Sequence, residues 1–106
     1  MIDWGRIDEL REEVGAEDLA EVVEMFCEEV DEVLTGLSTI SSPELPSQIH
    51  FLKGSAQNIG ISGLAEQCKS IEEAMRNDPN ITPDIPRLIS VFDKARAALS
   101  QRLEPD

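Results

Sequence analysis

Residues 45–75, LPSQIHFLKGSAQNIGISGLAEQCKSIEEAM, predict two helices joined by a tight turn. Apolar residues recur at spacings of 4, 3, 4 and 3 in the first half and 4, 3 and 4 in the second. That is the period of one face of an α-helix. The run from Gly60 to Gly63 between the halves is typical of a short helix–helix connection. The apolar positions are Leu45, Ile49, Leu52, Ala56 and Ile59, then Leu64, Cys68, Ile71 and Met75.

The same period appears before this hairpin, and nothing in the chain alternates as a β-strand would. A short helix is predicted from about Asp3 to Val14, ended by Gly15, and a longer one from about Glu17 to Leu37. Residues 39–43 predict a loop, and Pro43 or Pro46 suits the first turn of the next helix. The inward positions predicted for these two helices are Trp4, Ile7, Leu10 and Val14, then Leu19, Val22, Val23, Phe26, Val30, Val33, Leu34 and Leu37.

A last helix follows the hairpin. Residues 77–80 predict the end of the preceding helix, and Thr82 with Pro83 predicts the start of the new one. Pro86 is tolerated if it falls in the first turn. The predicted inward positions are Ile85, Leu88, Ile89, Phe92, Ala95, Leu99 and Leu103.

These elements predict an all-α protein. Four helices of similar length with short connections indicate an antiparallel four-helix bundle, and we expect the additional short N-terminal helix to cap one end. A chain of 106 residues is expected to form a single domain over residues 1–106. Cys27 and Cys68 lie within apolar stripes, so we expect buried free thiols, as in a reducing cytosol.

Composition excludes several classes of function. The chain has 9 Lys and Arg against 22 Asp and Glu, a net charge of −13, which argues against nucleic acid or an anionic membrane as a partner. One histidine excludes a multi-histidine metal site on a single chain, and we expect no metal or cofactor on it. No run approaches the roughly 18 apolar residues of a membrane span. Residues 1–5 lack the basic start of a signal peptide. We therefore expect a cytoplasmic protein, and a monomer because no extra apolar face demands a dimer.

His50, the only histidine, is expected to face outward from its helix. On a helical projection it falls about 140° from the apolar line, and Gly54 falls at about 180°. Glycine costs about 1 kcal/mol relative to alanine in a helix interior, so Gly54 favours close approach of another protein at this point. Between Glu44 and Glu66 there is no acid, and Lys53 is the only charged residue, so an anionic group is admitted here. A solvated surface histidine remains the alternative.

Glu72 is the predicted partner of His50. If the chain reverses near residue 61 or 62, residue 50 lies level with residue 72 or 73. Glu72 lies beside the apolar stripe, so its carboxylate is expected to accept a hydrogen bond from Nδ1–H of His50. That bond would set the tautomer and leave Nε2 as an oriented nucleophile. The alternative is one more solvated acid in an acid-rich chain.

One stretch resembles a known family. The run His50-Phe51-Leu52-Lys53-Gly54-Ser55-Ala56, with Gly60, Leu64, Cys68 and Glu72 after it, resembles the signature of the histidine phosphotransfer (HPt) domain family. The rest of the chain agrees with that family only in helical layout and length. The resemblance implies a carrier that relays a phosphoryl group from a sensor histidine kinase or a receiver aspartate to a response-regulator aspartate in a two-component phosphorelay.

The resemblance also implies roles for individual residues. His50 would accept the phosphoryl group, Lys53 would screen its charge, and Glu72 would orient the imidazole, at a position that is Gln in many family members. Gly54 would be the small residue that receiver docking needs, and we expect Phe51, Ser55 and Gln57 around it on the docking face. The receiver would supply the aspartate and Mg²⁺, so this chain would be a stoichiometric carrier and not an enzyme.

Two other functions fit the same residues. One is an acidic helical adaptor or inhibitor that binds a basic partner, in which His50 is incidental. The other is a degenerate HPt protein that docks receivers without accepting phosphate.

Overall fold

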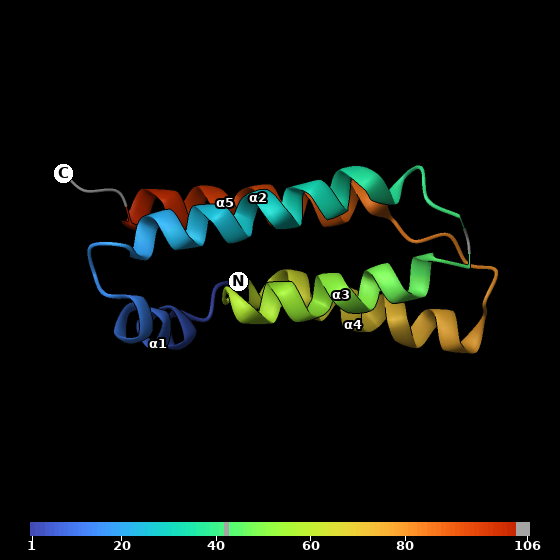
Figure 1. Ribbon diagram of the computed structural model, residues 1–106. Coiled ribbons are helices and arrows are strands. Elements are labelled where there is room, and N and C mark those ends of the chain that lie inside the picture. The colour runs from blue at the N-terminus through green and yellow to red at the C-terminus, as the bar shows by residue number, and fades with distance from the viewer. Residues whose placement is uncertain (42, 104–106) are drawn as a thin grey trace.

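The computed structural model describes residues 1–41 and 43–103. Within these ranges the chain forms helices and no strand (Figure 1), as the sequence predicts. Ser42, in the predicted loop, and residues 104–106 of the predicted domain lie outside the described residues. The helices are α1 (Trp4–Val14), α2 (Leu19–Leu37), α3 (Leu45–Asn58), α4 (Ser62–Asn77) and α5 (Ile85–Leu103).

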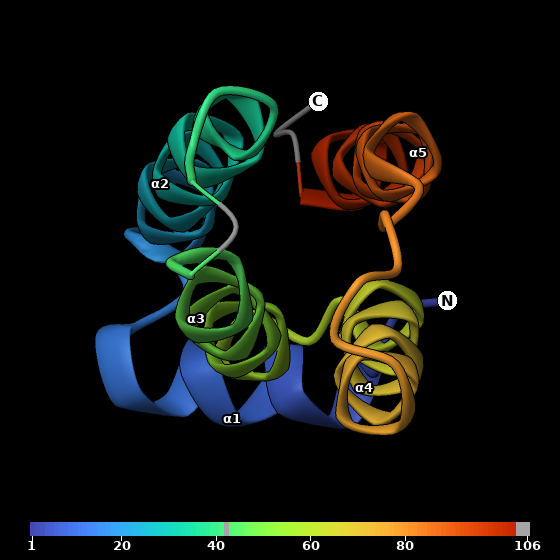
Figure 2. The same cartoon turned by 90° about the vertical axis from the view of Figure 1, so that its right-hand side faces the viewer.

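The four long helices lie side by side in two pairs. In Figure 1, α2 and α5 form the upper pair and α3 and α4 the lower one, and consecutive helices run in opposite directions. Figure 2 shows them end-on, with α3 and α5 at opposite corners. Each long helix packs against two others: α2 on α3 and α5, and α4 on α3 and α5. α1 lies at the end where α3 turns into α4, and it contacts α2.

The core follows the predicted apolar faces, except that one predicted residue is exposed and that Ile61 of the α3–α4 turn, which was not predicted as a core residue, is fully buried. Ile89 was predicted to point inward and is 37% exposed. The buried line of α5 is Leu88, Phe92, Ala95 and Leu99, which follows the helical spacing of 4, 3 and 4, and Ile89 lies one residue off that line. Burial of the free thiols Cys27 and Cys68 is confirmed. None of the described helices combines the length and the apolar character of a bilayer-spanning segment.

The helix boundaries have local causes. The Asp3 carboxylate accepts a hydrogen bond from the Arg6 amide, which caps the start of α1, and Gly15 ends that helix at a φ of 89°. α5 starts at Ile85 and not at Thr82 as predicted. The Asp84 carboxylate accepts from the Arg87 amide at 3.1 Å, the position of an N-terminal cap, so this side chain sets where the helix begins.

The turn between α3 and α4 depends on glycine. Gly60 has a φ of 75°, a conformation that other residues adopt only with strain. Its carbonyl accepts a hydrogen bond from the Asp3 amide at 2.7 Å. A Cβ at Gly60 would lie 2.9 Å from the Asp3 carbonyl oxygen, and one at Gly63 would lie 2.5 Å from the Met1 nitrogen. The absence of side chains here lets the N-terminal segment approach the turn.

Further hydrogen bonds fix the N-terminal segment to this turn. The Met1 carbonyl accepts from the Gly63 amide and from the Ser62 hydroxyl, both at 3.0 Å. The Arg6 guanidinium donates to the main-chain and side-chain oxygens of Asn58, at 2.8 and 3.0 Å. The start of the chain thus closes the end of the α3–α4 hairpin.

We expect Gly60→Ala to lower the free energy of unfolding by about 1–2 kcal/mol, because a residue with a Cβ is strained at positive φ. Urea unfolding monitored by circular dichroism measures this loss. The control is Gly36→Ala in α2, where an added Cβ meets no atom within 4 Å. That change is expected to be neutral or to stabilise by up to about 1 kcal/mol. Equal unfolding midpoints for wild type and Gly60→Ala would contradict the role assigned to this turn.

Candidate functional site

His50 lies on the outer face of α3 and is highly exposed. Its side chain keeps 71% of its accessible surface, while its neighbours Ile49 and Leu52 are fully buried. The two buried side chains set the rotation of α3 about its axis, so the imidazole is held toward solvent. One turn further along, Gly54 is also exposed, and an added Cβ there meets nothing within 4 Å.

Glu72 of α4 lies beside His50, in the register that the hairpin turn predicts. Nδ1 of His50 is 3.4 Å from Oε2 of Glu72, at the long end for a hydrogen bond. Nδ1 is the ring nitrogen that faces this carboxylate, so a neutral imidazole that donates a hydrogen bond to it carries its proton at Nδ1. Nε2, on the opposite edge of the ring, then has its lone pair directed away from α4.

Glu72 also binds Lys53, a contact that the sequence did not predict. Nζ of Lys53 is 2.9 Å from Oε1 of Glu72, and both side chains are largely buried, at 22% and 16% exposure. Among the described residues Oε1 has almost no solvent access and no other polar partner, so the ammonium is the one compensating charge found there. This contact with Lys53 holds the pKa of the Glu72 carboxyl below its ordinary value, with His50 adding to the effect.

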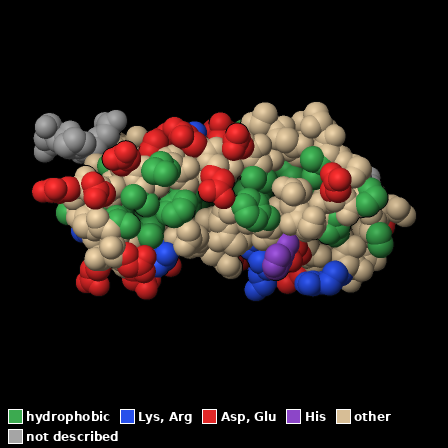
Figure 3. All heavy atoms as spheres, in the orientation of Figure 1, with side chains coloured by type: hydrophobic (Ala, Val, Ile, Leu, Met, Phe, Trp, Pro, Cys, Tyr) green, Lys and Arg blue, Asp and Glu red, His purple; other side chains and the backbone are tan. Residues whose placement is uncertain are grey.

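The three side chains therefore form one polar cluster across α3 and α4. The charges of Lys53 and Glu72 offset one another, and the exposed imidazole of His50 contacts the second oxygen of Glu72. In Figure 3 the histidine lies among Lys and Arg side chains, and most of the acidic side chains on that face gather at the end near α1 and along the upper edge. The stretch of sequence around His50 contains no acid, and the surface around it on this face carries few acidic side chains. Glu72 is the acid that contacts the imidazole.

The predicted docking residues are mostly accessible. Phe51 is 47% exposed, and Gly54 and Gln57 are exposed as well. Ser55 is half-buried, since it lines a hollow of about 50 Å³ between α2 and α3. The other residues that line this hollow are Phe26, Glu29 and Asn58. The sequence predicted Phe26 as an inward position, but it predicted none of the three as part of the docking face, because α2 and α3 meet only in the folded protein.

A second hollow adjoins Glu72 on the other side, between α3 and α4. It has a volume of about 250 Å³ and is lined by Pro46, Glu72, Met75 and Arg76. Pro46 precedes His50 by one turn of α3, and Arg76 follows Glu72 by one turn of α4, so the hollow borders the site. The spacing of Arg76 from Glu72 was a signal in the sequence that the prediction did not use.

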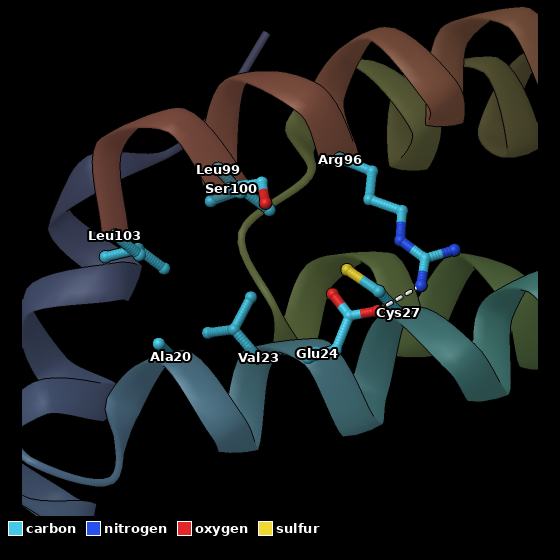
Figure 4. A pocket seen from close by; sticks show the side chains of 8 residues that line it. All are labelled: Ala20, Val23, Glu24, Cys27, Arg96, Leu99, Ser100 and Leu103. Carbon is cyan, nitrogen blue, oxygen red and sulfur yellow. Dashed lines mark hydrogen bonds and ion pairs between the residues drawn. The ribbon is translucent and has the colours of Figure 1, made fainter. Parts of the chain in front are cut away.

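The cavity around Cys27 does not suit nucleophilic chemistry. It lies between α2 and α5 (Figure 4), holds about 50 Å³, and is bordered by the ion pair between Arg96 and Glu24. Burial raises the pKa of the Cys27 thiol to about 11 and that of Cys68 to about 12. Both thiols are therefore protonated at neutral pH, whereas a reactive cysteine needs to be a thiolate.

No group of three or more His, Cys, Asp and Glu side chains is arranged to hold a metal ion in residues 1–41 and 43–103. The site contains one imidazole, one ammonium and one carboxylate, which suits an exposed nucleophile that gains a negative charge.

Comparison with known protein families gave one match. A family model described as Hpt domain matches residues 21–104, most of the chain, and leaves α1 outside the matched range. The search of curated proteins found no match. The search of solved structures found none either.

The lowered pKa of Glu72 predicts a pH-dependent contribution to stability. A carboxyl whose pKa is lower in the folded state stabilises the fold above its unfolded pKa, and this contribution is lost as the pH falls through the folded value. We therefore expect Glu72→Gln to lower the free energy of unfolding at pH 7. Its difference from wild type is expected to shrink from about pH 5 to pH 3.

Urea unfolding at pH 7, 5 and 3 measures this difference. The matched control is Glu73→Gln, which removes an exposed carboxylate from the same helix and is expected to show no comparable change with pH. A Glu72→Gln difference that stays constant from pH 7 to pH 3 would show that the charge of Glu72 is not what stabilises the fold.

Proposed function

We propose that this chain, which belongs to the Hpt domain family, accepts a phosphoryl group on His50 and passes it to an aspartate of a response-regulator receiver domain. Membership of the family implies involvement in a two-component phosphorelay. The assignment of the reaction to His50 rests on one observation above all. The imidazole is 71% exposed and its Nδ1 faces the partly buried carboxylate of Glu72, so Nε2 is presented to a partner.

The proposed reaction is a direct transfer. The Nε2 lone pair of neutral His50 forms a bond to phosphorus as the bond from phosphorus to the donor oxygen breaks, and the donor keeps that electron pair as a carboxylate when it is an aspartyl phosphate. Nδ1 keeps its proton, and the carboxylate of Glu72 offsets the positive charge on the ring. The reverse order of the same steps returns the phosphoryl group to an aspartate.

Lys53 is proposed to screen the phosphoryl group. Its pairing with Glu72 at 2.9 Å holds the ammonium one turn from His50, and the stem of the side chain is mostly buried, which limits its motion. A phosphoryl group adds a charge of about −1.5 to −2 beside this pair. The ammonium is then attracted by both anions, and it stays close to the phosphoryl oxygens.

The receiver is proposed to dock on the exposed face around His50. Gly54 has open space where a Cβ would lie, so a partner backbone can approach α3 there. Phe51, Ser55 and Gln57 are proposed as the surrounding contacts. The receiver would contribute the aspartate and Mg²⁺, and this chain, with no turnover of its own, would act as a stoichiometric carrier.

We also propose a specific helix arrangement, a cellular location and an oligomeric state. The ring of contacts among α2, α3, α4 and α5 supports an antiparallel four-helix bundle, and the hydrogen bonds from the N-terminal segment to the α3–α4 turn support α1 as a cap on one end. Buried free thiols suit the cytoplasm. We propose a monomer.

Labelling tests the carrier function directly. Incubation with a phosphorylated receiver domain, or with a kinase that phosphorylates family members, is expected to give an acid-labile, base-stable label on the wild type and none on His50→Gln. A label that persists on His50→Gln would exclude His50 as the acceptor. No label on the wild type with a competent donor would leave a docking or adaptor protein as the function.

Gly54 separates docking from folding. Gly54→Ala is expected to raise the free energy of unfolding by about 0.5–1 kcal/mol, since alanine is the better helix former and its Cβ meets no atom. Gly54→Gln is expected to keep the fold and slow phosphoryl transfer, because the longer side chain holds the partner away from α3. Ser90→Gln on the exposed face of α5 is the control and should leave the transfer rate unchanged. An unchanged rate for Gly54→Gln would rule out close docking at this point.

A further inference from the structure

An apolar groove lies between the start of the chain and α5, away from His50. Its volume is about 470 Å³. Met1, Ile2 and Trp4 line one side, and Val91, Ala95 and Ala98 line the other. The groove is largely apolar, and the charged residue in its lining is the exposed Lys94.

Two cations border this groove, although the protein is acidic: Lys94 lines it and Arg102 lies against Trp4. α5 carries four basic residues and one acid, a net charge of +3, in a chain whose net charge is −13. The guanidinium of Arg102 stacks on the Trp4 ring, 4.7 Å from its centroid, and Lys94 makes no ion pair among the described residues. Lys94, Ala98 and Arg102 follow one another at intervals of four residues, so two cations flank a small apolar residue on one helix face.

The family match does not cover the whole groove. The family match covers residues 21–104, so the side formed by Met1, Ile2 and Trp4 lies outside it. The groove is also independent of the phosphotransfer site, because α5 and α3 occupy opposite corners of the helix arrangement (Figure 2) and His50 points outward from α3. A partner in the groove leaves the imidazole accessible.

We propose that this groove is a docking site for an acidic amphipathic helix of a protein partner. The apolar face of the helix would cover Trp4, Ala95 and Ala98, and its carboxylates would pair with Lys94 and Arg102. These two cations are eight residues apart on α5, about 12 Å along the axis, which is the rise of a little over two helical turns. The partner helix therefore needs acids about two turns apart beside an apolar stripe.

The proposed occupant runs against the overall charge of the protein. The net charge of −13 favours a basic peptide, whereas the local cations favour an acidic one. At physiological ionic strength charges farther than about 8 Å are largely screened, so the nearby cations decide the preference. In combination with the proposed phosphotransfer function, such docking would tether a kinase or receiver and raise its local concentration at His50. The docking itself does not depend on that function.

Two synthetic peptides of equal length test the proposal. Both carry the same helical leucine pattern and no tryptophan, with glutamate on the flanks of one and lysine on the flanks of the other. Fluorescence of Trp4, the one tryptophan of the chain, reports occupancy of the groove, and calorimetry gives Kd in about 0.15 M salt. The glutamate peptide is expected to bind more tightly than the lysine peptide.

Charge-reversal variants locate the binding site. Lys94→Glu is expected to raise the Kd of the glutamate peptide roughly five- to ten-fold. Arg87→Glu makes the same charge change on α5 outside the groove lining and is expected to leave Kd within about two-fold. Circular dichroism checks that both variants fold. Tighter binding of the lysine peptide, no saturable binding of the glutamate peptide, or equal weakening by both variants would overturn the proposal.

The same protein preparation is labelled at His50 as a separate measurement. Peptide binding without a phosphoryl label would refute the proposed function and leave the docking site standing. A phosphoryl label without peptide binding would refute the docking site and leave the proposed function standing. A label whose amount is unchanged when the glutamate peptide is bound is expected, because the groove and His50 lie on different sides of the molecule.

Discussion

The contact between Glu72 and His50 depends on the register of the α3–α4 hairpin. The two residues lie 22 positions apart in sequence, yet Oε2 comes within 3.4 Å of Nδ1. A shift of one residue in α3 would turn the imidazole about 100° about its helix axis, and a shift in α4 would do the same to the carboxylate, so the two groups would no longer meet. The register is set by the turn, where Gly60 adopts a φ of 75° and its carbonyl binds the Asp3 amide. The chemistry of the site is therefore determined partly at the far end of the hairpin.

Glu72 contacts both of the other polar side chains of the site. Its Oε1 is buried and depends on the Lys53 ammonium for compensation, while Oε2 holds the imidazole. Leaving a buried carboxylate oxygen without a partner costs free energy, so the two contacts stabilise one another as long as both remain. In the proposed function, a phosphoryl group on His50 would meet an ammonium that is already in place and would lose little entropy on binding it.

The surface divides into regions with different electrostatic character. α2 carries six acids and no base, whereas α5 has a net charge of +3. A net charge of −13 hides this division, because it averages over all five helices of the described structure. The site around His50 and the groove beside Trp4 both lie where the local charge departs from that average. Recognition of a partner at either place would depend on this local charge, because salt screens charges that lie farther away.

The sequence by itself determined the helices, the outward position of His50 and its register with Glu72. These follow from a period of 3.6 residues and a short turn, both of which are local properties of the chain. The tertiary structure alone decided the other contacts between side chains of different helices. Lys53 pairs with Glu72, Ser55 faces Phe26, and Trp4 packs under Arg102. The tertiary structure also decided that Ile89 faces solvent. An apolar residue at the edge of a stripe is buried only if a neighbouring helix covers it, and the positions of neighbouring helices are not encoded in local spacing.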